Sequence, residues 1–502
     1  MKDIRNSIRS GARSHVQSIP TGVPGLDAVL GGGLAEYSFN LIAGAPGSGK
    51  TTLAQQIAFA NGTPERPALY FTVLGEPTIK MLRYQQRFLF FRPELVGTAV
   101  RYINLSEEAL RGDLAATLDR IIQEVESVAP GIVIVDSFRT LGRVALMQAD
   151  ASDQAEALGL EHFVQRLALH LTTWEITSFL IGEYAEADQR SPVFTVADGI
   201  LWLSQPIDGN SVVRKLQAIK VRGQSQMPGL HTFRITELGL QVFPRIPEQQ
   251  LERRVPAVER LATGVPGLDV LMGGGIPAGD AVMIVGPTGS GKSTIGMQFA
   301  SAALRRGEHG VVIVFEEYPE EYLTRALRLD PHVEADVQAD TLRIIYLRPL
   351  DLSVDETLAE LLEAVDAIGA SWVVIDSVSG FEIALAPTYR EDFRESLYRL
   401  VGALTASAVT VVMTAEVVQS DVDAGFTTDR VSFITDDIIV QRYVELDGRL
   451  QTVLVVVKMR GSAHSREFHQ YELTPAGAVI GAPLVGYEGI MTGVPTLAPP
   501  TA

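Results

Sequence analysis

The stretch GAPGSGKTT (44–52) decides the fold, and it occurs a second time as GPTGSGKST (286–294). Both stretches match the pattern GxxxxGK[ST], in which a glycine-rich loop cradles phosphate groups with its backbone amides. Each follows an apolar, strand-like run (SFNLIA or AVMIV) and opens a helix-like run, which is the context that the pattern requires. A chance glycine-rich turn does not explain two matches in the same context. The sequence therefore predicts two P-loop nucleotide-binding domains.

The whole chain repeats itself, with a spacing of about 240 residues that is far longer than a solenoid repeat. Each copy should therefore own a complete core. The matched landmarks are TGVPGLDAVLGGG (21–33) with TGVPGLDVLMGGG (263–275), the two phosphate loops, GIVIVDS (131–137) with WVVIDS (372–377), and KVRG (220–223) with KMRG (458–461). We expect one domain at 1–247 and a second at 248–502. The linker between them is expected in PRIPEQQLERRVPAVER (244–260), which is rich in proline and charge.

Within each copy, short β-branched runs alternate with longer helical patterns. Strands that are apolar throughout and separated by helices predict an α/β fold with a mainly parallel sheet covered on both faces. We expect strands at 38–43, 67–73, 131–136, 176–182, 199–203, 280–285, 311–315, 341–346, 371–376 and 408–414, and helices at 50–61, 78–90, 106–127, 153–172, 292–306, 319–329, 354–368 and 390–406. The tails of the copies, 211–243 and 442–480, look antiparallel and should extend the sheet edges.

Composition limits the class of protein. At 502 residues, with 46% hydrophobic and 20% charged residues, the chain is typical of folded soluble proteins. Its apolar runs are of strand length, well short of the roughly 20 residues that a membrane-spanning helix needs, and residues 1–15 do not resemble a secretory signal. There is no cysteine, which excludes disulfides and thiolate metal sites. We expect a cytoplasmic protein. A net charge of −18 argues against nucleic-acid binding.

The phosphate loops predict specific ligands for ATP and Mg²⁺. Lys50 and Lys292 should reach the β- and γ-phosphates, while the hydroxyls of Thr51 and Ser293 should ligate the metal. Asp136 and Asp376 end apolar strands, where a carboxylate can hold the hydration shell of Mg²⁺, although an aspartate in that position can also be a turn former. The remaining predicted nucleotide-binding residues of the loops are Gly44, Gly47, Ser48, Gly49, Thr52, Gly286, Gly289, Ser290, Gly291 and Thr294.

The catalytic base is expected away from the strand aspartates, because serine follows each of them. In the second copy, Glu316 and Glu317 end the strand at 311–315, where a carboxylate could orient water, deprotonate a hydroxyl or, for Glu316, assist the metal. A solvated acidic turn is the alternative. The first copy has Leu74 and Gly75 at the matching positions and Glu76 one residue later. The two sites are therefore not equivalent: the first domain uses Glu76 after a small shift of the loop, hydrolyses slowly, or mainly binds nucleotide.

Together, the TGVPGLD motifs, the phosphate loops, the Asp–Ser strands, the Glu316–Glu317 pair and the K-x-R-G stretches resemble the KaiC family of RecA-like circadian clock ATPases and autokinases. The resemblance spans nearly the whole chain. It implies a homohexamer of stacked rings with ATP at subunit interfaces, and a KaiB-like protein partner. It also implies that Lys220, Arg222, Lys458 and Arg460 reach a neighbour's nucleotide. A K-x-R pair on a strand directs both cations to one face, as a γ-phosphate clamp needs, although exposed strand salt bridges are the alternative.

The resemblance also implies autophosphorylation in the second domain. Ser432 falls on the family's acceptor serine, Phe433 replaces the acceptor threonine, and Thr427 matches a further hydroxyl. We expect autophosphorylation at the single site Ser432, with Glu316 as the base. The alternative is that Ser432 has only a structural role. The short tail after 491–497 argues against a KaiA-type partner, and Leu329 stands where clock members carry a tryptophan beside adenine.

Two other functions compete with an ATP-hydrolysing, self-phosphorylating signalling hexamer. The first is a RecA- or DnaB-like motor that moves on DNA. Such motors need basic loops in a central channel, and the stretches after Asp136 and Asp376 hold few cations and no aromatic ladder. The second is a nucleotide-gated scaffold that assembles with little turnover.

Overall fold

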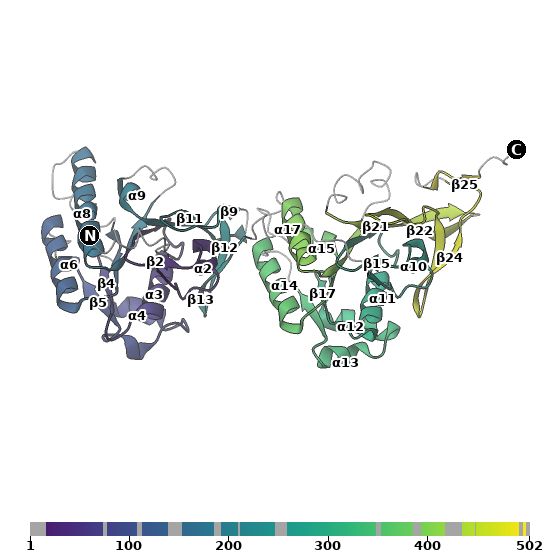
Figure 1. Cartoon of the computed structure of the whole chain (residues 1–502), viewed down its shortest axis with the longest axis horizontal. Coiled ribbons are helices and arrows are strands. Elements are labelled where there is room, and N and C mark those ends of the chain that lie inside the picture. Colours follow the sequence, from purple (N-terminus) through teal and green to yellow (C-terminus); the bar gives the residue numbers. More distant parts are fainter. Residues whose placement is uncertain are drawn as a thin grey trace, which may run out of the picture. The chain divides into compact units, whose positions relative to one another are not determined.

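The computed structural model describes residues 17–73, 78–107, 113–138, 153–184, 192–208, 211–245, 259–347, 353–384, 393–416, 434–446, 448–490 and 495–497. The chain divides into two compact units, Met1–Arg245 and Ile246–Ala502. Each unit is a twisted sheet flanked by helices (Figure 1). Domain limits of 1–247 and 248–502 stay a prediction, because most of the expected linker lies outside the described residues.

The first unit is built on one nine-stranded sheet with the strand order β13-β12-β11-β8-β3-β7-β6-β4-β5. From β8 to β5 all neighbours are parallel, whereas β11, β12 and β13 pair antiparallel at the other edge. The strands are β3 (Phe39–Gly44), β4 (Ala68–Thr72), β5 (Val100–Asn104), β6 (Ile132–Asp136), β7 (Thr177–Glu183), β8 (Gly199–Ser204), β11 (Lys215–Val221), β12 (His231–Thr236) and β13 (Gly239–Phe243). The P-loop strand β3 is central.

The second unit repeats this arrangement in a nine-stranded sheet with the order β18-β17-β19-β20-β16-β21-β22-β23-β24. From β18 to β21 the neighbours are parallel, and β22, β23 and β24 add an antiparallel edge. The strands are β16 (Ala281–Gly286), β17 (Gly310–Val314), β18 (Leu342–Tyr346), β19 (Trp372–Asp376), β20 (Thr410–Glu416), β21 (Asp437–Leu446), β22 (Arg449–Met459), β23 (His469–Thr474) and β24 (Gly477–Pro483). The expected α/β fold with two RecA-like domains is confirmed.

Helices cover both faces of each sheet, and neighbouring residues of a strand serve different cores. In β3, Leu41 and Ala43 pack in the cluster that contains α6 and α8, whereas Ile42 packs in the cluster that contains α3. No described helix combines the length and apolar character needed to cross a membrane. The longer helices are α3 (Lys50–Asn61), α4 (Thr78–Gln85), α6 (Leu114–Val128), α8 (Asp153–Thr173), α11 (Lys292–Arg305), α12 (Pro319–Leu329), α14 (Val354–Ile368) and α17 (Phe393–Ala406). The shorter ones are α2 (Leu26–Leu30), α9 (Pro192–Val196), α10 (Leu268–Leu271), α13 (Val333–Gln338) and α15 (Val378–Ala384).

The structure differs from the sequence-based expectation at a few elements. Strand β5 is not predicted, and β21 is parallel to β16 although its residues were assigned in part to an antiparallel tail. The helix expected at 78–90 ends at Gln85. These errors lie at sheet margins and element ends, where tertiary pairing outweighs local pattern.

In both units the repeated TGVPGLD motif forms a turn that a threonine–aspartate hydrogen bond closes. In the first unit, Asp27 Oδ1 accepts hydrogen bonds from the Thr21 amide (2.9 Å) and the Thr21 hydroxyl (2.6 Å). In the second, Asp269 Oδ1 accepts from the Thr263 amide at 2.8 Å. The motif therefore fixes how the chain enters each sheet.

Asp437, the first residue of β21, is a buried carboxylate at the position where the first unit has Gly199. Its Oδ1 accepts from the Arg460 amide at 3.4 Å, while Oδ2 is buried and has no hydrogen-bond partner among the described residues. Burial raises the pKa of Asp437 to about 7, with the charge of Asp280 adding to the effect. The folded state therefore favours the neutral carboxyl group.

Replacing Asp437 by Asn should stabilise the protein at alkaline pH. Below the ordinary pKa of 3.8, Asp437 is protonated in both the folded and the unfolded state, and its ionisation does not affect stability. Between 3.8 and about 7 only the unfolded state ionises, so the folded state loses stability as the pH rises. Above about 7 both states are ionised and the loss is complete. The Asn variant should unfold at a temperature higher by several degrees at pH 8, with a smaller difference at pH 5. Thermal unfolding of Glu472→Gln, an exposed residue of β23, controls for loss of a charge. A pH-independent difference would contradict the burial of an ionisable group.

Candidate functional site

The first phosphate loop connects β3 to α3, and its lysine folds back into the loop. Gly47 and Gly49 have φ angles of 76° and 98°, which residues with a side chain rarely adopt. Lys50 Nζ donates to the carbonyl oxygens of Gly44 (3.0 Å) and Ala45 (2.7 Å). Burial lowers the pKa of Lys50, against the charges of Glu183 and Asp136. The ammonium group is thus held against the backbone of the phosphate loop, as expected of a lysine that serves a triphosphate site.

The second loop, between β16 and α11, has the same construction. Gly289 and Gly291 have φ angles of 78° and 90°, and Lys292 Nζ donates to the carbonyl oxygen of Pro287 at 2.8 Å. Burial lowers the pKa of Lys292, and the charges of Glu416, Asp376 and Glu316 oppose that effect. The two predicted lysines therefore occupy equivalent positions.

The remaining loop residues divide into two kinds. Ser48 and Ser290 are buried, and Ser290 Oγ donates to Gln441 Oε1 at 3.1 Å. Their amides donate to the carbonyl oxygens of Ala45 and Pro287, both at 3.3 Å, which closes the turn of each loop. Thr52 and Thr294 lie in the first turns of α3 and α11, next to Thr51 and Ser293. Helix N-termini add amides and partial positive charge for an anion.

In the first domain, the structure brings the predicted magnesium ligands together. Thr51 Oγ1 donates to Asp136 Oδ2 at 2.9 Å, and the hydroxyl of Tyr70 donates to the same oxygen at 2.6 Å. Burial raises the pKa of Asp136, and the hydrogen bonds from Tyr70 and Thr51 oppose it. A hydroxyl and a carboxylate suit Mg²⁺, which keeps several waters and shares phosphate oxygens. Accordingly, the described residues contain no group of three or more His, Asp or Glu side chains that would form an all-protein metal cage.

In the second domain, Asp376 ends β19 and accepts a hydrogen bond at Oδ1 from the Thr414 hydroxyl at 2.5 Å. Ser293 begins the first turn of α11 after Lys292. The oxygen ligands available to Mg²⁺ are of the same kind in both domains. The strand that donates a hydroxyl hydrogen bond to the aspartate differs, however: it is β4 in the first domain and β20 in the second.

The adjacent glutamates after β17 have different surroundings. Glu316 Oε1 accepts from the Ser377 hydroxyl at 3.0 Å, which directs this carboxylate to the end of β19, beside Asp376. Glu317 forms an ion pair with Arg325 of α12. Burial raises the pKa of Glu317, and Arg325 opposes the shift. The predicted pair is therefore split, with Glu316 facing the metal side and Glu317 tied to a helix.

Two carboxylates near the loops were missed by sequence reasoning. Glu183 ends β7 and is the register partner of Gly44, and Glu416 ends β20 and is the register partner of Gly286. The Thr288 hydroxyl of the second loop donates to Glu416 Oε1. In both copies an acidic residue ends an apolar run, and this pattern could have pointed to Glu183 and Glu416. The sequence does not show, however, that their strands lie beside the P-loop strand.

The K-x-R-G cations lie at the opposite end of the sheet from the phosphate loop of their own domain. Val221 pairs with Gly199, which pairs with Asn40 near the start of β3, whereas the loop follows Gly44 at its other end. Four residues of strand separate these ends by about 13 Å. Lys220 and Lys458 lie on strands, but Arg222 and Arg460 come directly after strand ends, so the expectation that both cations of a pair lie on one strand is wrong.

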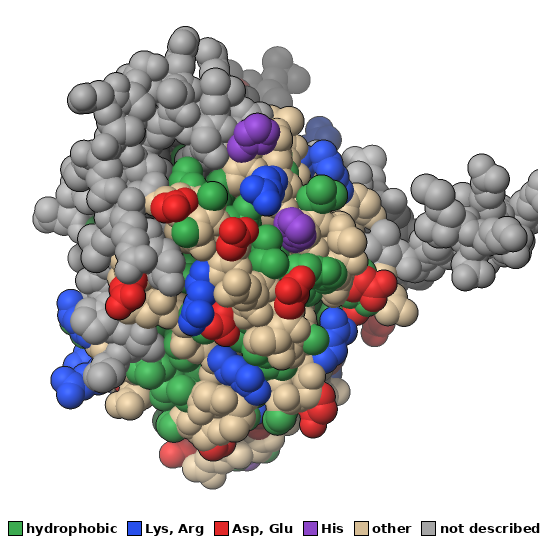
Figure 2. Space-filling view, turned by 90° about the vertical axis from the view of Figure 1, so that its left-hand side faces the viewer, with side chains coloured by type: hydrophobic (Ala, Val, Ile, Leu, Met, Phe, Trp, Pro, Cys, Tyr) green, Lys and Arg blue, Asp and Glu red, His purple; other side chains and the backbone are tan. Residues whose placement is uncertain are grey.

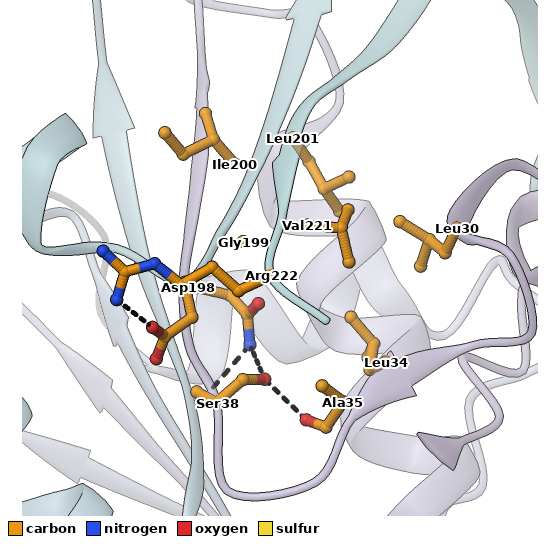
Figure 3. A pocket seen from close by; sticks show the side chains of 11 residues that line it. Leu30, Leu34, Ala35, Ser38, Asp198, Gly199, Ile200, Leu201, Val221 and Arg222 are labelled. Carbon is orange, nitrogen blue, oxygen red and sulfur yellow. Dashed lines mark hydrogen bonds and ion pairs between the residues drawn. The ribbon is translucent and has the colours of Figure 1, made fainter. Parts of the chain in front are cut away.

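Both arginines form an ion pair with an aspartate that also accepts a hydrogen bond from the P-loop strand; Figure 3 shows the pair formed by Arg222 and Asp198. Arg222 Nη1 lies 2.9 Å from Asp198 Oδ1, and the Phe39 amide of β3 donates to Asp198 Oδ2 at 3.1 Å. In the second domain, Arg460 Nη1 lies 3.0 Å from Asp436 Oδ1. The lysines donate to carbonyl oxygens, Lys220 to Thr195 (3.2 Å) and Lys458 to Thr435 (2.5 Å).

Several predicted residues lie outside the described residues. They are Leu74, Gly75 and Glu76 in the first domain and Thr427, Ser432 and Phe433 in the second. The expected acceptor serine comes shortly before Ile434, where the description of the chain resumes.

Comparison with known proteins agrees with this duplicated architecture. The family model of the KaiC ATPase matches the chain twice, over residues 19–246 and 261–485. The chain belongs to the KaiC family of ATPases. It is 27% identical to the circadian clock oscillator protein KaiC of Picosynechococcus sp. over 98% of this chain and 94% of that protein. It is 26% identical to KaiC of Synechococcus elongatus over 96% of this chain and 92% of the relative. The double-domain KaiC architecture thus extends over both phosphate loops.

Each P-loop lysine should control one nucleotide site of this KaiC-family chain. The wild type should bind two ATP molecules per chain with Mg²⁺, Lys50→Ala and Lys292→Ala one each, and the double variant none, because each loses the ammonium group in one loop. Equilibrium dialysis with labelled ATP measures the stoichiometry. Lys80→Ala, an exposed lysine of α4, is the matched control. Full stoichiometry in the double variant would rule out both sites.

Proposed function

We propose that this chain is a cytoplasmic, Mg²⁺-dependent ATPase that works as a homohexamer with ATP bound at subunit interfaces and transfers phosphate to its own Ser432. A double-domain ATPase of the KaiC family is the starting point. Our proposal adds four features to this: hexamer formation, a Mg²⁺ requirement, autokinase activity and a KaiB-like partner. The family resemblance supports all four.

The observation that carries this proposal is the separation of the K-x-R-G cations from the phosphate loop of their own sheet. Arg222 and Arg460 follow strands that pair with the start of β8 and β21, whereas the loops follow the opposite ends of β3 and β16. An arginine that stabilises charge on a transferring phosphoryl group must approach it directly. We propose that a second copy of the chain brings loop and arginine together; such a head-to-tail contact, when repeated, forms a ring if its rotation closes.

Within one domain, the proposed chemistry divides among a few groups. Lys50 or Lys292 binds the β- and γ-phosphates, and Thr51 with Asp136, or Ser293 with Asp376, holds the metal. When bound, Mg²⁺ neutralises charge on the phosphate oxygens. In the second domain, Glu316 lies beside Asp376 through its hydrogen bond with Ser377. Its carboxylate is suited to accept a proton from water or from Ser432.

The first domain has fewer assigned groups. Glu76 remains the proposed base from the sequence, and Glu183 lies at the loop as the register partner of Gly44. Since no acidic pair follows β4, we propose that the first domain hydrolyses ATP more slowly than the second.

A DNA-dependent motor is less well supported. The face of the first domain drawn in Figure 2 has Lys and Arg side chains interspersed with Asp and Glu, rather than one basic field, among the described residues visible there. Combined with a net charge of −18, this gives a nucleic-acid backbone little to bind.

Mixing two inactive variants should restore ATPase activity if the arginines act across subunits. Lys50→Ala/Lys292→Ala chains lack the loops' ammonium groups, and Arg222→Ala/Arg460→Ala chains lack the arginines. In rings assembled from equal amounts, about a quarter of the interfaces join an intact loop to an intact arginine, so roughly a quarter of wild-type activity should return. Phosphate release measures it.

No recovery in rings that co-purify through an affinity tag carried by only one of the two variants would place the arginines in their own subunit's site and overturn the ring proposal. Single-stranded DNA added to the wild type is a second arm, because strong stimulation would favour the motor.

Incubation with ATP and Mg²⁺ should add about 80 Da to the chain, the mass of one phosphoryl group. The increment should be absent in Ser432→Ala and strongly reduced in Glu316→Gln. Intact-mass spectrometry measures both, with Ser407→Ala as control for loss of a serine in the same domain. An increment that persists in Ser432→Ala would assign the acceptor elsewhere, and none in the wild type would leave hydrolysis alone.

A further inference from the structure

Three polar side chains form a buried cluster beneath the first phosphate loop. Gln55 comes from α3, Tyr70 from β4 and Tyr102 from β5. Gln55 and Tyr70 are fully buried, and the Tyr102 hydroxyl donates to Gln55 Oε1 at 2.6 Å. The two tyrosine rings lie 5.5 Å apart, and Gln55 Nε2 donates to Met81 Sδ at 3.4 Å. The cluster thus joins the P-loop helix to two neighbouring strands.

This cluster contacts the aspartate assigned to the metal. The Tyr70 hydroxyl donates to Asp136 Oδ2 at 2.6 Å, and Thr51 Oγ1 donates to the same oxygen at 2.9 Å. Burial raises the pKa of Tyr70 well above its ordinary value, so the hydroxyl keeps its proton and remains a donor. Two donors on one carboxylate oxygen fix the rotation of the carboxylate and therefore the direction of its other oxygen.

The second domain has the same backbone but none of these polar groups. With the offset of 242 between the copies, Gln55, Tyr70 and Tyr102 correspond to Met297, Val312 and Ile344, all of which pack in one apolar core. Apolar side chains therefore fill this space without difficulty. Burying polar groups in the first domain is unfavourable unless they are hydrogen-bonded, so packing alone does not account for them.

The support of Asp376 comes from the other neighbouring strand. Thr414 on β20 donates to Asp376 Oδ1 at 2.5 Å. Thr414 pairs with Ile284 on the P-loop strand, and at the matching register of the first sheet Ile181 pairs with Ile42. The hydroxyl that a neighbouring strand donates to the strand aspartate thus comes from β4 in the first domain, where Thr51 of α3 also donates, and from β20 in the second.

We propose that Tyr70, packed against Tyr102, is a positioning residue that fixes Asp136 for the Mg²⁺–nucleotide complex of the first domain, as Thr414 fixes Asp376 in the second. This inference rests on the proposed Mg²⁺-dependent function. Tyr70 touches neither metal nor nucleotide and acts through Asp136. The two sites therefore hold their metal through different partners, and each can be changed without altering the other.

The test measures how much Mg²⁺ strengthens ATP binding at the first site. Full-length chains carrying Lys292→Ala leave only that site, and a fluorescent ATP analogue is titrated with Mg²⁺ and with EDTA. Tyr70→Phe should reduce the ratio of the two dissociation constants about tenfold, as loss of an outer partner of a metal ligand typically does. The dissociation constant in EDTA should stay unchanged, because the loop itself is intact.

A rescue variant separates positioning from folding. Tyr70→Phe combined with Ile181→Thr gives the first domain the hydroxyl that the second domain uses, and most of the Mg²⁺ dependence should return. In the mirror experiment, Thr414→Val in a Lys50→Ala background should weaken the Mg²⁺ dependence of the second site. Thr414→Val in the Lys292→Ala background is the matched control and should have no effect.

An unchanged Mg²⁺ ratio in Tyr70→Phe would overturn the positioning role. Equal weakening with Mg²⁺ and with EDTA, without rescue by Ile181→Thr, would also overturn it, because a merely structural defect acts on both. If the Lys292→Ala parent binds ATP equally well with and without Mg²⁺, the proposed function itself fails at this site. That result is distinct from a failure of Tyr70.

Discussion

The confinement of two lysine ammonium groups inside glycine-rich turns is the interaction on which each domain depends. Lys50 and Lys292 are nearly buried, and both donate to carbonyl oxygens of their own loops. A buried cation requires compensating groups, which the loop carbonyls and the surrounding carboxylates supply. This arrangement requires a strand that ends shortly before a helix begins, as β3 does before α3 and β16 before α11. Both strands lie in the middle of their sheets, with a strand on either side.

The parallel sheet gives each domain two chemically different ends. Strand carboxyl ends carry the loop, the strand aspartate and the acidic residues that follow neighbouring strands. The amino ends of β3 and β8 adjoin Arg222, which is held by Asp198. Because Asp198 contacts both Arg222 and the first residue of β3, the arginine is joined mechanically to the strand that leads to its own loop. In the proposed ring, Arg222 would contact the nucleotide of a neighbouring subunit. A shift of Arg222 in that contact would then reach β3 and the phosphate loop of its own subunit through Asp198.

The two copies share the phosphate loop and the strand aspartate, but they differ in the side chains that hydrogen-bond with the aspartate. Both strand aspartates accept a hydroxyl hydrogen bond from a neighbouring strand, but the donor is Tyr70 of β4, in addition to Thr51 of α3, in one domain and Thr414 of β20 in the other. The acidic pair after β17 has no counterpart after β4. If the two domains turn over at different rates, as we propose, these supporting residues offer a physical reason, because partners of a metal ligand affect metal binding while the phosphate loops keep the same construction.

The sequence by itself determined the number of domains, the α/β class, both loops and the strand aspartates, because these depend on local patterns and on a repeat that can be counted. Tertiary structure decided which side chains meet. Tyr70 and Asp136 are 66 residues apart and touch only because β4 lies beside β6. Glu183 reaches the loop because β7 lies beside β3, and Arg222 is remote from it because β11 runs antiparallel to β8. Strand order follows from how whole layers pack, and no spacing between residues in the chain encodes it.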